Sequence, residues 1–570
     1  MRKTRWGLLV LLAVVGWMVL SRLGGGPAIE PGSTLLIELS GEYVEGAEAP
    51  LFGQLLGFER QSLLGTLSNL RKAERDDRIK QVLITVRDLQ IGWAKAQELR
   101  DAIRALRDKG RRPVVILEVE GFGANLEYYV ASAAERLYVA PGGGAPILGL
   151  AEEHMFLGGL WDRIGITVQV AQVGRYKGAA DSIVSREMSE PYREQAERLL
   201  DSIDNQFIAG ISEARGVTVD VVRKVIATAP SRAEVLEELK LVDGVKTRRA
   251  LIDAIPEDKR VEAADYAAVD PESVGFSPEA TFALVYGSGA IQSGHGSISR
   301  SGQPVFASET VMDALEEAAE DETVRAIVLR IDSPGGSAFP SEQMWHAIRA
   351  AREKKPVIAS FSDYAASGGY YLASAADAIV SQPATLTGSI GVFAVRPALD
   401  GLFRRFDINT ATLDRAPHAE IGLMGPELSP DTRDWLQADV EETYRRFLAR
   451  VAEGRGRSVE EVAAVAEGQV WTGEQAVTRG LVDTIGGLRS AVSKAKEKVG
   501  LGADADVTLT VYPAPKPFAE QLREALRVSV ARSVAESLPW SETFAHFETW
   551  VAAITAPGLV LAQPLWVDIQ

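Results

Sequence analysis

Residues 363–376 read Asp-Tyr-Ala-Ala-Ser-Gly-Gly-Tyr-Tyr-Leu-Ala-Ser-Ala-Ala. The residues before them, 355–360, have the pattern of a short buried strand, and the alanine-rich run that ends at Ala376 has the pattern of the first turns of a helix. Ser367 is therefore expected at a corner where a strand gives way to a helix. The free backbone N–H groups of a helix N-terminus, here those of Gly368 and Gly369, can face a developing oxyanion. Ser367 is a candidate nucleophile, although a serine that only caps the helix has the same local sequence.

A second glycine-rich turn precedes this corner by one expected strand. Residues 332–337 read Asp-Ser-Pro-Gly-Gly-Ser and follow the apolar run 326–331. Proline followed by two glycines predicts a tight turn with exposed backbone N–H groups, so Gly335 or Gly336 can supply a second oxyanion donor beside Ser367. Such a turn is common on its own, and only its pairing with the Ser-Gly-Gly corner indicates chemistry.

Short apolar strands alternate with helices from residue 34 onward, which predicts an α/β fold. The order of these elements occurs twice. Residues 128–135, Tyr-Tyr-Val-Ala-Ser-Ala-Ala-Glu, match residues 370–377, Tyr-Tyr-Leu-Ala-Ser-Ala-Ala-Asp. An internal repeat is the simplest explanation. When the two copies are aligned on these tyrosines, Ser367 corresponds to Asn125, so the first copy has no hydroxyl nucleophile at this corner.

A serine nucleophile needs a base, and the first copy offers one. The sequence Gly-Arg-Tyr-Lys-Gly-Ala, residues 174–179, follows an apolar strand expected at 166–170 and contains Lys177. The same alignment places Ala419 opposite Lys177, so the two copies complement each other. An ordinary lysine titrates near 10.4, and a basic role requires burial that lowers its pKa by about three units. A lysine in a glycine-rich loop is otherwise most often a surface residue.

The chain is expected to divide into five segments. Arg2, Lys3 and Arg5 precede the apolar run 6–20, which has the pattern of a secretory signal or a membrane anchor. No Ala-x-Ala cleavage site follows directly, which favours an uncleaved anchor that contacts the lipid bilayer through residues 6–23. A polar, proline-containing stretch separates the copies. The expected segments are an N-terminal membrane anchor (1–27), a first α/β repeat that supplies Lys177 (28–255), a linker (256–278), a second α/β repeat that supplies Ser367 (279–500) and a C-terminal extension (501–570).

Composition excludes several kinds of chemistry. The 78 Asp and Glu residues outnumber the 61 Lys and Arg residues, which argues against a nucleic-acid partner. The absence of cysteine excludes disulfides, thiolate metal sites and a cysteine nucleophile. The five histidines have no metal-ligand spacing, and a Ser-His-Asp triad has no support from the sequence. We expect neither a metal nor an organic cofactor.

Four motifs together resemble one family. They are residues 332–337, 363–371, 387–392 (Thr-Gly-Ser-Ile-Gly-Val) and 174–177. They are similar to motifs of the long, tandem-repeat form of the bacterial signal peptide peptidase A (protease IV) family, which are serine peptidases with a Clp-protease and crotonase-like fold. The resemblance covers about residues 34–500. It implies a Ser/Lys dyad assembled from both repeats, with Ser367 as nucleophile and Lys177 as general base. By the same resemblance, Ser389 orients the lysine, and the backbone of Gly368 and of Gly335 or Gly336 forms the oxyanion hole.

The resemblance also implies a setting for the activity. It implies a homotetramer anchored in the bacterial cytoplasmic membrane by a single span, with the catalytic part on the extracytoplasmic, periplasmic side. Hydrophobic peptides, such as the remnants of cleaved signal peptides, are the implied substrates.

Two other functions have part of the same sequence support. A crotonase-type acyl-CoA enzyme shares the fold and uses paired N–H groups to hold a thioester enolate, but it explains neither the N-terminal apolar run nor the pairing of Ser367 with Lys177. A catalytically inactive membrane scaffold would retain the repeats for assembly alone. A nucleotide site at Gly287-Ser288-Gly289 is the weakest alternative, because the next glycine, Gly294, comes too late for the dinucleotide motif.

Overall fold

The computed structural model describes residues 29–46, 61–121, 123–297, 304–513 and the backbone of 560–562. The expected membrane anchor, residues 1–27, lies outside the described residues, as does most of the C-terminal extension. Within the described ranges, no helix combines the length and apolar character needed to cross a bilayer.

The first half of the chain is built on a parallel sheet with strand order β2-β1-β3-β4-β5. A further strand, β7, pairs with β1 on the edge opposite β3. The strands are β1 (Ser33–Val44), β2 (Gln61–Ser62), β3 (Ile79–Gln90), β4 (Pro113–Leu117), β5 (Arg136–Val139) and β7 (Arg260–Glu262). The helices that follow β2, β3 and β4 are α3 (Leu63–Arg75), α4 (Trp93–Asp108) and α5 (Asn125–Ala131). Strand and helix alternate as the sequence predicts.

The second half contains a sheet with strand order β17-β15-β13-β11-β8-β19, in which β14 pairs with β13 and β18. All its pairings are parallel except that of β15 with β17. The strands are β8 (Pro278–Ser288), β11 (Val324–Ser333), β13 (Val357–Ala366), β14 (Ala378–Ser381), β15 (Leu386–Gly388), β17 (Val470–Thr472), β18 (Thr484–Ile485) and β19 (Asp506–Tyr512). The predicted α/β class is confirmed.

The two faces of this second sheet are covered differently. Side chains of β11 such as Ile327 and Leu329 pack in a core with the helices α13 (Ser308–Glu320), α14 (Ala338–Arg352) and α15 (Gly368–Ala373). The alternate side chains, Ala326 and Val328, pack with α20 (Leu488–Lys498) on the other face. Because side chains alternate along a strand, Arg330 belongs to this second face, which also meets the first half of the chain.

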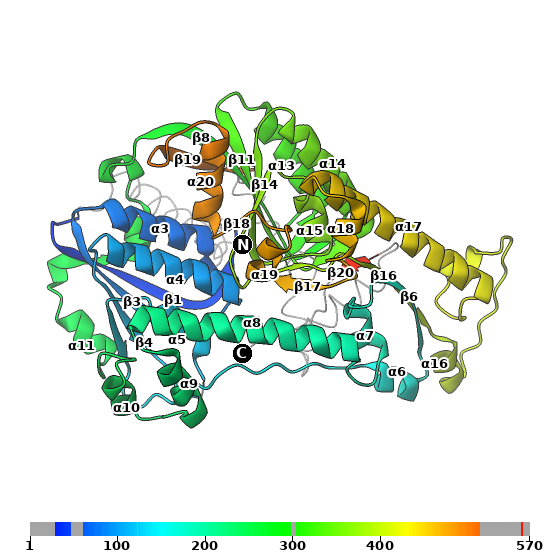
Figure 1. Cartoon of the computed structure of the whole chain (residues 1–570), viewed down its shortest axis with the longest axis horizontal. Helices are drawn as coiled ribbons and strands as arrows, with labels where there is room; N and C mark the ends of the chain where they lie inside the picture. The colour runs from blue at the N-terminus through cyan, green and yellow to red at the C-terminus, as the bar shows by residue number, and fades with distance from the viewer. Residues whose placement is uncertain (1–28, 47–60, 122, 298–303, 514–559, 563–570) are drawn as a thin grey trace, which may run out of the picture.

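A smaller mixed sheet joins the two halves, with strand order β10-β9-β12-β20-β16-β6. Its members are β6 (Thr167–Val173), β9 (Ala290–Gln292), β10 (Val305–Ala307), β12 (Gly335–Ser337), β16 (Val392–Ala398) and β20 (Val560–Ala562). Only β6 comes from the first half. It runs antiparallel to β16 over its whole length, from Thr167 opposite Ala398 to Val173 opposite Val392. Figure 1 shows β6 beside β16, far from the β1, β3 and β4 sheet of its own half. This pairing carries the residues after β6 into the second half.

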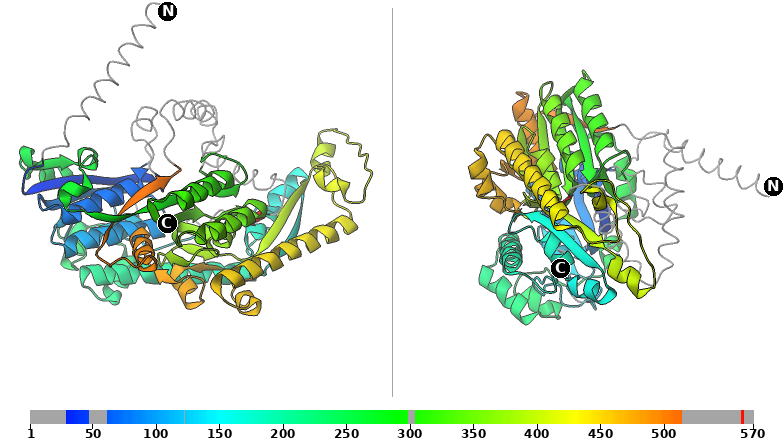
Figure 2. Two further views of the ribbon diagram at one scale, coloured as in Figure 1. Left: turned by 90° about the horizontal axis from the view of Figure 1, so that it is seen from above. Right: turned by 90° about the vertical axis from the view of Figure 1, so that its right-hand side faces the viewer.

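Two long helices begin in the same way. The Ser189 side chain caps α8 (Glu190–Arg215) and the Ser429 side chain caps α17 (Pro430–Arg455), each by accepting a hydrogen bond from a backbone N–H three residues later. In Figure 1, α8 extends from the region of α7 and β6 back beneath the first sheet, and in Figure 2 α17 projects from the body of the molecule. The remaining helices are α6 (Gly158–Ile164), α7 (Ala179–Val184), α9 (Val219–Thr228), α10 (Ala233–Glu238), α11 (Arg248–Asp253), α16 (Asp400–Arg405), α18 (Val459–Ala463) and α19 (Gly473–Thr478).

The stretch expected as a linker, residues 256–278, is packed against the first half. Besides β7 it contains α12 (Ala263–Ala267) and two short 3₁₀ turns, Glu257–Lys259 and Pro271–Val274. Tyr266 is fully buried, and its hydroxyl donates a hydrogen bond to Asp76 at 3.1 Å. The buried tyrosine and the pairing of β7 with β1 explain why this polar stretch folds onto the sheet.

Candidate active site

Ser367 lies at the corner that the sequence predicts, between the end of β13 and the start of α15. It is fully buried, with φ 52° and ψ −113°, a backbone conformation that residues with a side chain rarely adopt. Its N–H donates to Gly388 O at 2.8 Å, and its carbonyl accepts from Tyr371 N at 2.7 Å. The Ser367 side chain makes no capping bond to α15. The structure therefore does not use this serine as a helix cap.

The Ser367 hydroxyl instead contacts Lys177. The Nζ atom of Lys177 lies 2.8 Å from Ser367 Oγ, 2.9 Å from Ser389 Oγ and 2.8 Å from the Ser389 carbonyl oxygen. All three residues are buried, with Lys177 only 2% exposed. Burial holds the pKa of Lys177 well below its ordinary value. The structure thus brings together the three side chains that the sequence selected from both halves of the chain.

A neutral Lys177 can keep all three of these contacts. Such an amine has two N–H groups and one lone pair. The N–H groups can donate to the two oxygens of Ser389, and the lone pair can accept the Ser367 hydroxyl proton. In this arrangement Ser389 fixes the direction in which the lone pair points.

Backbone pairing between β6 and β16 positions Lys177 beside Ser367 and Ser389. The β6–β16 pairing brings Val173 opposite Val392, four residues before Lys177 and three after Ser389. The turn that follows is anchored by a hydrogen bond from Tyr176 N to Glu467 O at 2.9 Å. Ser389 is held in turn by its own N–H, which donates to Gln469 O at 2.7 Å. Residues of the second half therefore set the position of a side chain from the first.

The glycine turn after β11 lies next to the Ser367 corner. The Gly335 N–H donates to Ser333 Oγ at 3.1 Å, so that group already has a partner. Gly336 N lies 3.4 Å from the point that a Cβ on Gly368 would occupy. Gly336 itself has φ 155°, and a Cβ there would meet Ile291 O at 2.3 Å, so only glycine fits. Of the two glycines that the sequence left open, Gly336 is the better placed.

An extended strand fits between the edges of β12 and β16. β20, residues 560–562, pairs antiparallel with β12 over residues 335–337 and also pairs with β16 at Phe393. The glycine turn beside Ser367 therefore has a neighbouring edge that accepts a peptide backbone through strand addition.

The four histidines in the described part of the chain have partners elsewhere. His154 contacts Tyr192, His295 contacts Asp313, His346 contacts Glu342 and His418 contacts Thr432. The fifth, His546, lies outside the described residues. Sequence reasoning assigned no role to Lys95 or Asp363; the Lys95 ammonium group forms ion pairs with Asp363 and with Asp332, which lies beside the glycine turn. The sequence did contain one signal for this group of charges: Asp332 and Asp363 lie at or near the ends of two adjacent buried strands.

Known proteins match the chain along most of its length. The model of peptidase family S49 matches residues 106–262 and 349–502. A chloroplastic serine protease SPPA of Arabidopsis thaliana is 33% identical over 85% of this chain and 72% of its own length. Protease 4 of Salmonella typhi is 29% identical over 86% of this chain and 82% of its own length. Protease 4 of Haemophilus influenzae is 28% identical over 83% of this chain and 76% of its own length. The chain therefore belongs to peptidase family S49 and is a serine peptidase.

Proposed function

We propose that this peptidase acts through a Ser/Lys dyad formed by Ser367 and Lys177. The observation that carries the proposal is the 2.8 Å contact between Lys177 Nζ and Ser367 Oγ in a buried setting that lowers the pKa of the amine. Ser367 Oγ attacks the peptide carbonyl carbon while Lys177 takes the hydroxyl proton, and the carbonyl oxygen becomes an oxyanion. The N–H groups of Gly368 and Gly336 hold that oxyanion.

The same lysine completes the cycle. Lys177 passes the proton to the leaving amine, the carbon–nitrogen bond breaks, and an acyl group remains on Ser367 Oγ. A water molecule then attacks the acyl carbon as Lys177 takes one of its protons. The proton returns to Ser367 Oγ when the ester bond breaks and the acid product leaves. Ser389, through both of its oxygens, keeps the amine directed at Ser367 during these steps.

We propose that the substrates are hydrophobic peptides bound in extended form, cleaved signal peptides among them, and that cleavage is endoproteolytic. The pairing of β20 with both β12 and β16 supports binding by strand addition. The apolar run 6–20 supports a single-pass anchor, with the peptidase on the extracytoplasmic side of the bacterial cytoplasmic membrane.

We propose further that the two halves are tandem repeats, with the boundaries given above. Matching contacts support this. Tyr128 Oη donates to Leu241 O and Tyr370 Oη donates to Leu481 O, each from the tyrosine pair that aligns the copies. Equivalent ion pairs occur where the long helices α8 and α17 end: Arg215 with Asp243 in the first half, and Arg455 with Asp483 in the second.

Exposed apolar side chains support self-assembly, and we propose a homotetramer. Phe406 is 70% exposed, Leu413 is 87% exposed and Met424 is 47% exposed, and all three precede the projecting helix α17. Large apolar side chains gathered on one exposed segment are typical of protein contacts.

The test is hydrolysis of a fluorogenic hydrophobic peptide by the full chain in detergent, together with labelling by a fluorophosphonate, which reacts with activated serines. Ser367→Ala and Lys177→Met should both abolish turnover, and Ser367→Ala should abolish labelling. Ser374→Ala is the matched control, because Ser374 is equally buried at the end of α15 and its hydroxyl only donates to Tyr371 O. Full activity in Ser367→Ala contradicts the dyad. A wild-type chain that neither cleaves nor labels favours the inactive scaffold.

A further inference from the structure

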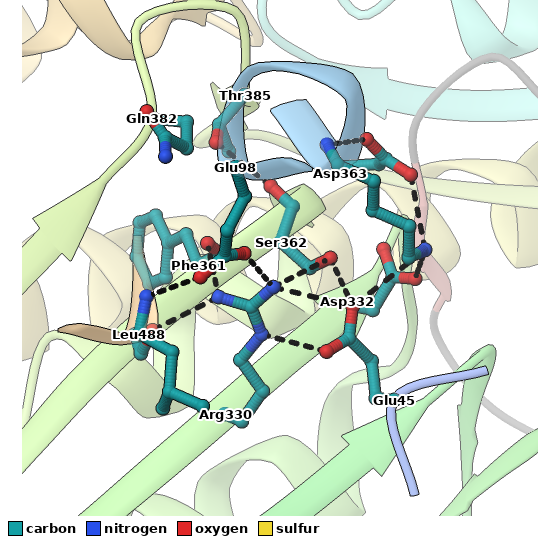
Figure 3. Close-up of polar contacts among 12 residues, drawn as sticks. Glu45, Glu98, Arg330, Asp332, Phe361, Ser362, Asp363, Gln382, Thr385 and Leu488 are labelled. Atoms are coloured by element: carbon teal, nitrogen blue, oxygen red, sulfur yellow. Dashed lines mark hydrogen bonds and ion pairs between the residues drawn. The ribbon is translucent and has the colours of Figure 1, made fainter. Parts of the chain in front are cut away.

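Six charged side chains are buried together where the two halves meet (Figure 3). Each of them is at most 15% exposed. The first half contributes Glu45, Lys95 and Glu98, and the second half contributes Arg330, Asp332 and Asp363. None of them has a role in the dyad described above, yet the last two lie close in sequence to the glycine turn and to Ser367.

Lys95 is the centre of the part nearest the active site. Its Nζ lies 2.5 Å from Asp332 Oδ2, 3.0 Å from Asp363 Oδ2 and 3.6 Å from Glu45 Oε1. Asp332 directly precedes the turn that contains Gly335 and Gly336. Asp363 precedes Ser367 by four residues on β13. One ammonium group of the first half therefore joins the two strands of the second half that carry the oxyanion turn and the nucleophile.

The two strands change register at the place where Lys95 binds. Ile331 on β11 lies opposite Phe361 on β13, but Ser333 lies opposite Ala365. Two steps along β11 thus correspond to four along β13, and the extra residues form a bulge that includes Asp363. In place of a regular ladder bond, Tyr364 N donates to Asp332 Oδ1 at 3.1 Å. Bulges redirect the chain that follows them, and here that chain is Ala365, Ala366 and Ser367.

Asp363 also fastens the bulge to the first half. Its Oδ1 accepts from Lys95 N at 2.9 Å and its Oδ2 accepts from Gly92 N at 3.0 Å, so it caps the start of α4. A Cβ at Gly92 would lie 2.4 Å from the carboxyl carbon of Asp363, and only glycine permits this approach. The helix that supplies Lys95 is therefore itself held by the residue that Lys95 binds.

Arg330 organises the rest of the cluster, away from the glycine turn. Its guanidinium bonds Glu45 at 2.8 Å and Glu98 at 2.6 Å, and it also donates to the Phe361 carbonyl oxygen at 3.1 Å. Glu98 in turn accepts from Leu488 N of α20 at 2.5 Å. Glu98 thus belongs to the same buried cluster but contacts neither Asp332 nor Asp363, which makes it a useful comparison.

We propose that Lys95 is a positioning residue for catalysis: by binding Asp332 and Asp363 together, it fixes the distance between the Gly336 oxyanion donor and Ser367. The inference rests on the proposed dyad and adds a residue that contacts neither substrate nor the reacting atoms. The ammonium is suited to this role because it stays charged. Burial alone lowers the pKa of Lys95, but Asp332, Asp363 and Glu45 together outweigh burial and raise it well above its ordinary value.

The experiment compares Lys95→Met with the wild-type chain, using the same peptide and fluorophosphonate. We expect kcat and the rate of Ser367 labelling to fall together by about 10²-fold, the usual effect of a displacement of about 1 Å at reacting groups. KM should change much less than kcat, because pairing of a peptide backbone with β12 and β16 tolerates a small displacement that the attack of Ser367 on the carbonyl carbon does not. The pH at which activity reaches half its maximum should also stay in place, because Lys177 remains the base. A residue that only maintains the fold would lower the number of active sites, so kcat per active site, counted from the amount of fluorophosphonate bound at completion, would stay at the wild-type value.

Two further variants decide between positioning and folding. Glu98→Gln removes an equally buried charge from the same cluster, and we expect it to lower the melting temperature while kcat per folded molecule stays unchanged. Asp332→Asn keeps an acceptor for Tyr364 N but loses the ion pair, and we expect it to lower kcat at least tenfold even if Lys95→Met does not fold. Equal kcat losses in Lys95→Met and Glu98→Gln, or wild-type kcat in Asp332→Asn, overturn the proposal. An error in the proposed dyad gives a different result from an error in the role of Lys95, because the wild-type chain would then not be labelled at Ser367.

Discussion

Lys95 and Lys177 make an instructive pair. Both come from the first half, both are buried, and both reach residues of the second half. Lys177 is surrounded by hydroxyl and carbonyl oxygens, and burial lowers its pKa. Lys95 is surrounded by carboxylates, which overcome burial and raise its pKa. Burial therefore does not decide whether a lysine is a base or a fixed cation; the charge of its partners does.

Replacement by arginine should give the largest difference in activity between the two lysines. Arginine keeps its charge at any pH compatible with folding, so it can replace a fixed cation but not a base. We expect Lys177→Arg to lower kcat/KM by about 10⁴-fold or more, close to the effect of losing the nucleophile. Lys95→Arg should keep most of the activity that Lys95→Met loses. Peptide hydrolysis by the two arginine variants measures both effects, and similar losses in both would remove the distinction between the lysines.

Replacement by methionine should change the free energy of unfolding differently for the two lysines. Lys95→Met leaves the buried carboxylates of Asp332 and Asp363 without their cation, and the free energy of unfolding should fall by about 3–5 kcal/mol. For Lys177 burial lowers the pKa, which means that the charged amine is less stable in the folded chain than in the unfolded chain, so this lysine opposes folding at pH values below its ordinary pKa. Lys177→Met relieves that cost but loses hydrogen bonds worth about 1 kcal/mol each, and the net change should stay within about 1 kcal/mol.

Chemical denaturation of both methionine variants at neutral pH tests this. A Lys177→Met chain that is as unstable as Lys95→Met would mean that Lys177 is charged in the folded protein.

The pH dependence of activity concerns Lys177 alone. Because only the neutral amine accepts the Ser367 proton, kcat/KM should rise tenfold per pH unit on the acidic side and level off well below 10.4, the ordinary lysine value. Ser389→Ala removes one of three contacts of Nζ and should lower kcat about tenfold, the effect of one lost hydrogen bond. Initial rates from pH 5 to 10 give both values. A rise centred above pH 10 would exclude Lys177 as the base.

Deleting residues 556–570 should have the smallest effect on activity, and it should not change the contacts of either lysine. This removes β20 from the edges of β12 and β16, where we propose that substrates bind. A segment that occupies the site part of the time lowers apparent affinity, so KM should fall a few-fold while kcat is unchanged. Neither the pH profile nor the melting temperature should move. An unchanged KM would place the peptide elsewhere.

Sequence patterns predicted the α/β class and selected Ser367 and Lys177, because the motifs around them have unusual local composition, and Ser389 followed only from the family resemblance. They could not select Lys95. It lies in an amphipathic helix, where a lysine is normally a solvated surface residue, and only packing between the halves buries it. The strand expected at residues 355–360 also extends to Ala366 as β13. Its later residues, Ser362, Asp363 and Tyr364, look like a loop until their partners from other segments are known.

The β6–β16 pairing has a consequence for the synthesis of this enzyme. The proposed base and nucleophile, Lys177 and Ser367, are 190 residues apart, and they meet only when β16 has formed and accepted β6. A ribosome that has completed the first half has therefore produced a lysine with no serine to activate. Proteolytic activity can begin only after most of the chain has emerged, so the growing polypeptide is protected from cleaving itself or its neighbours.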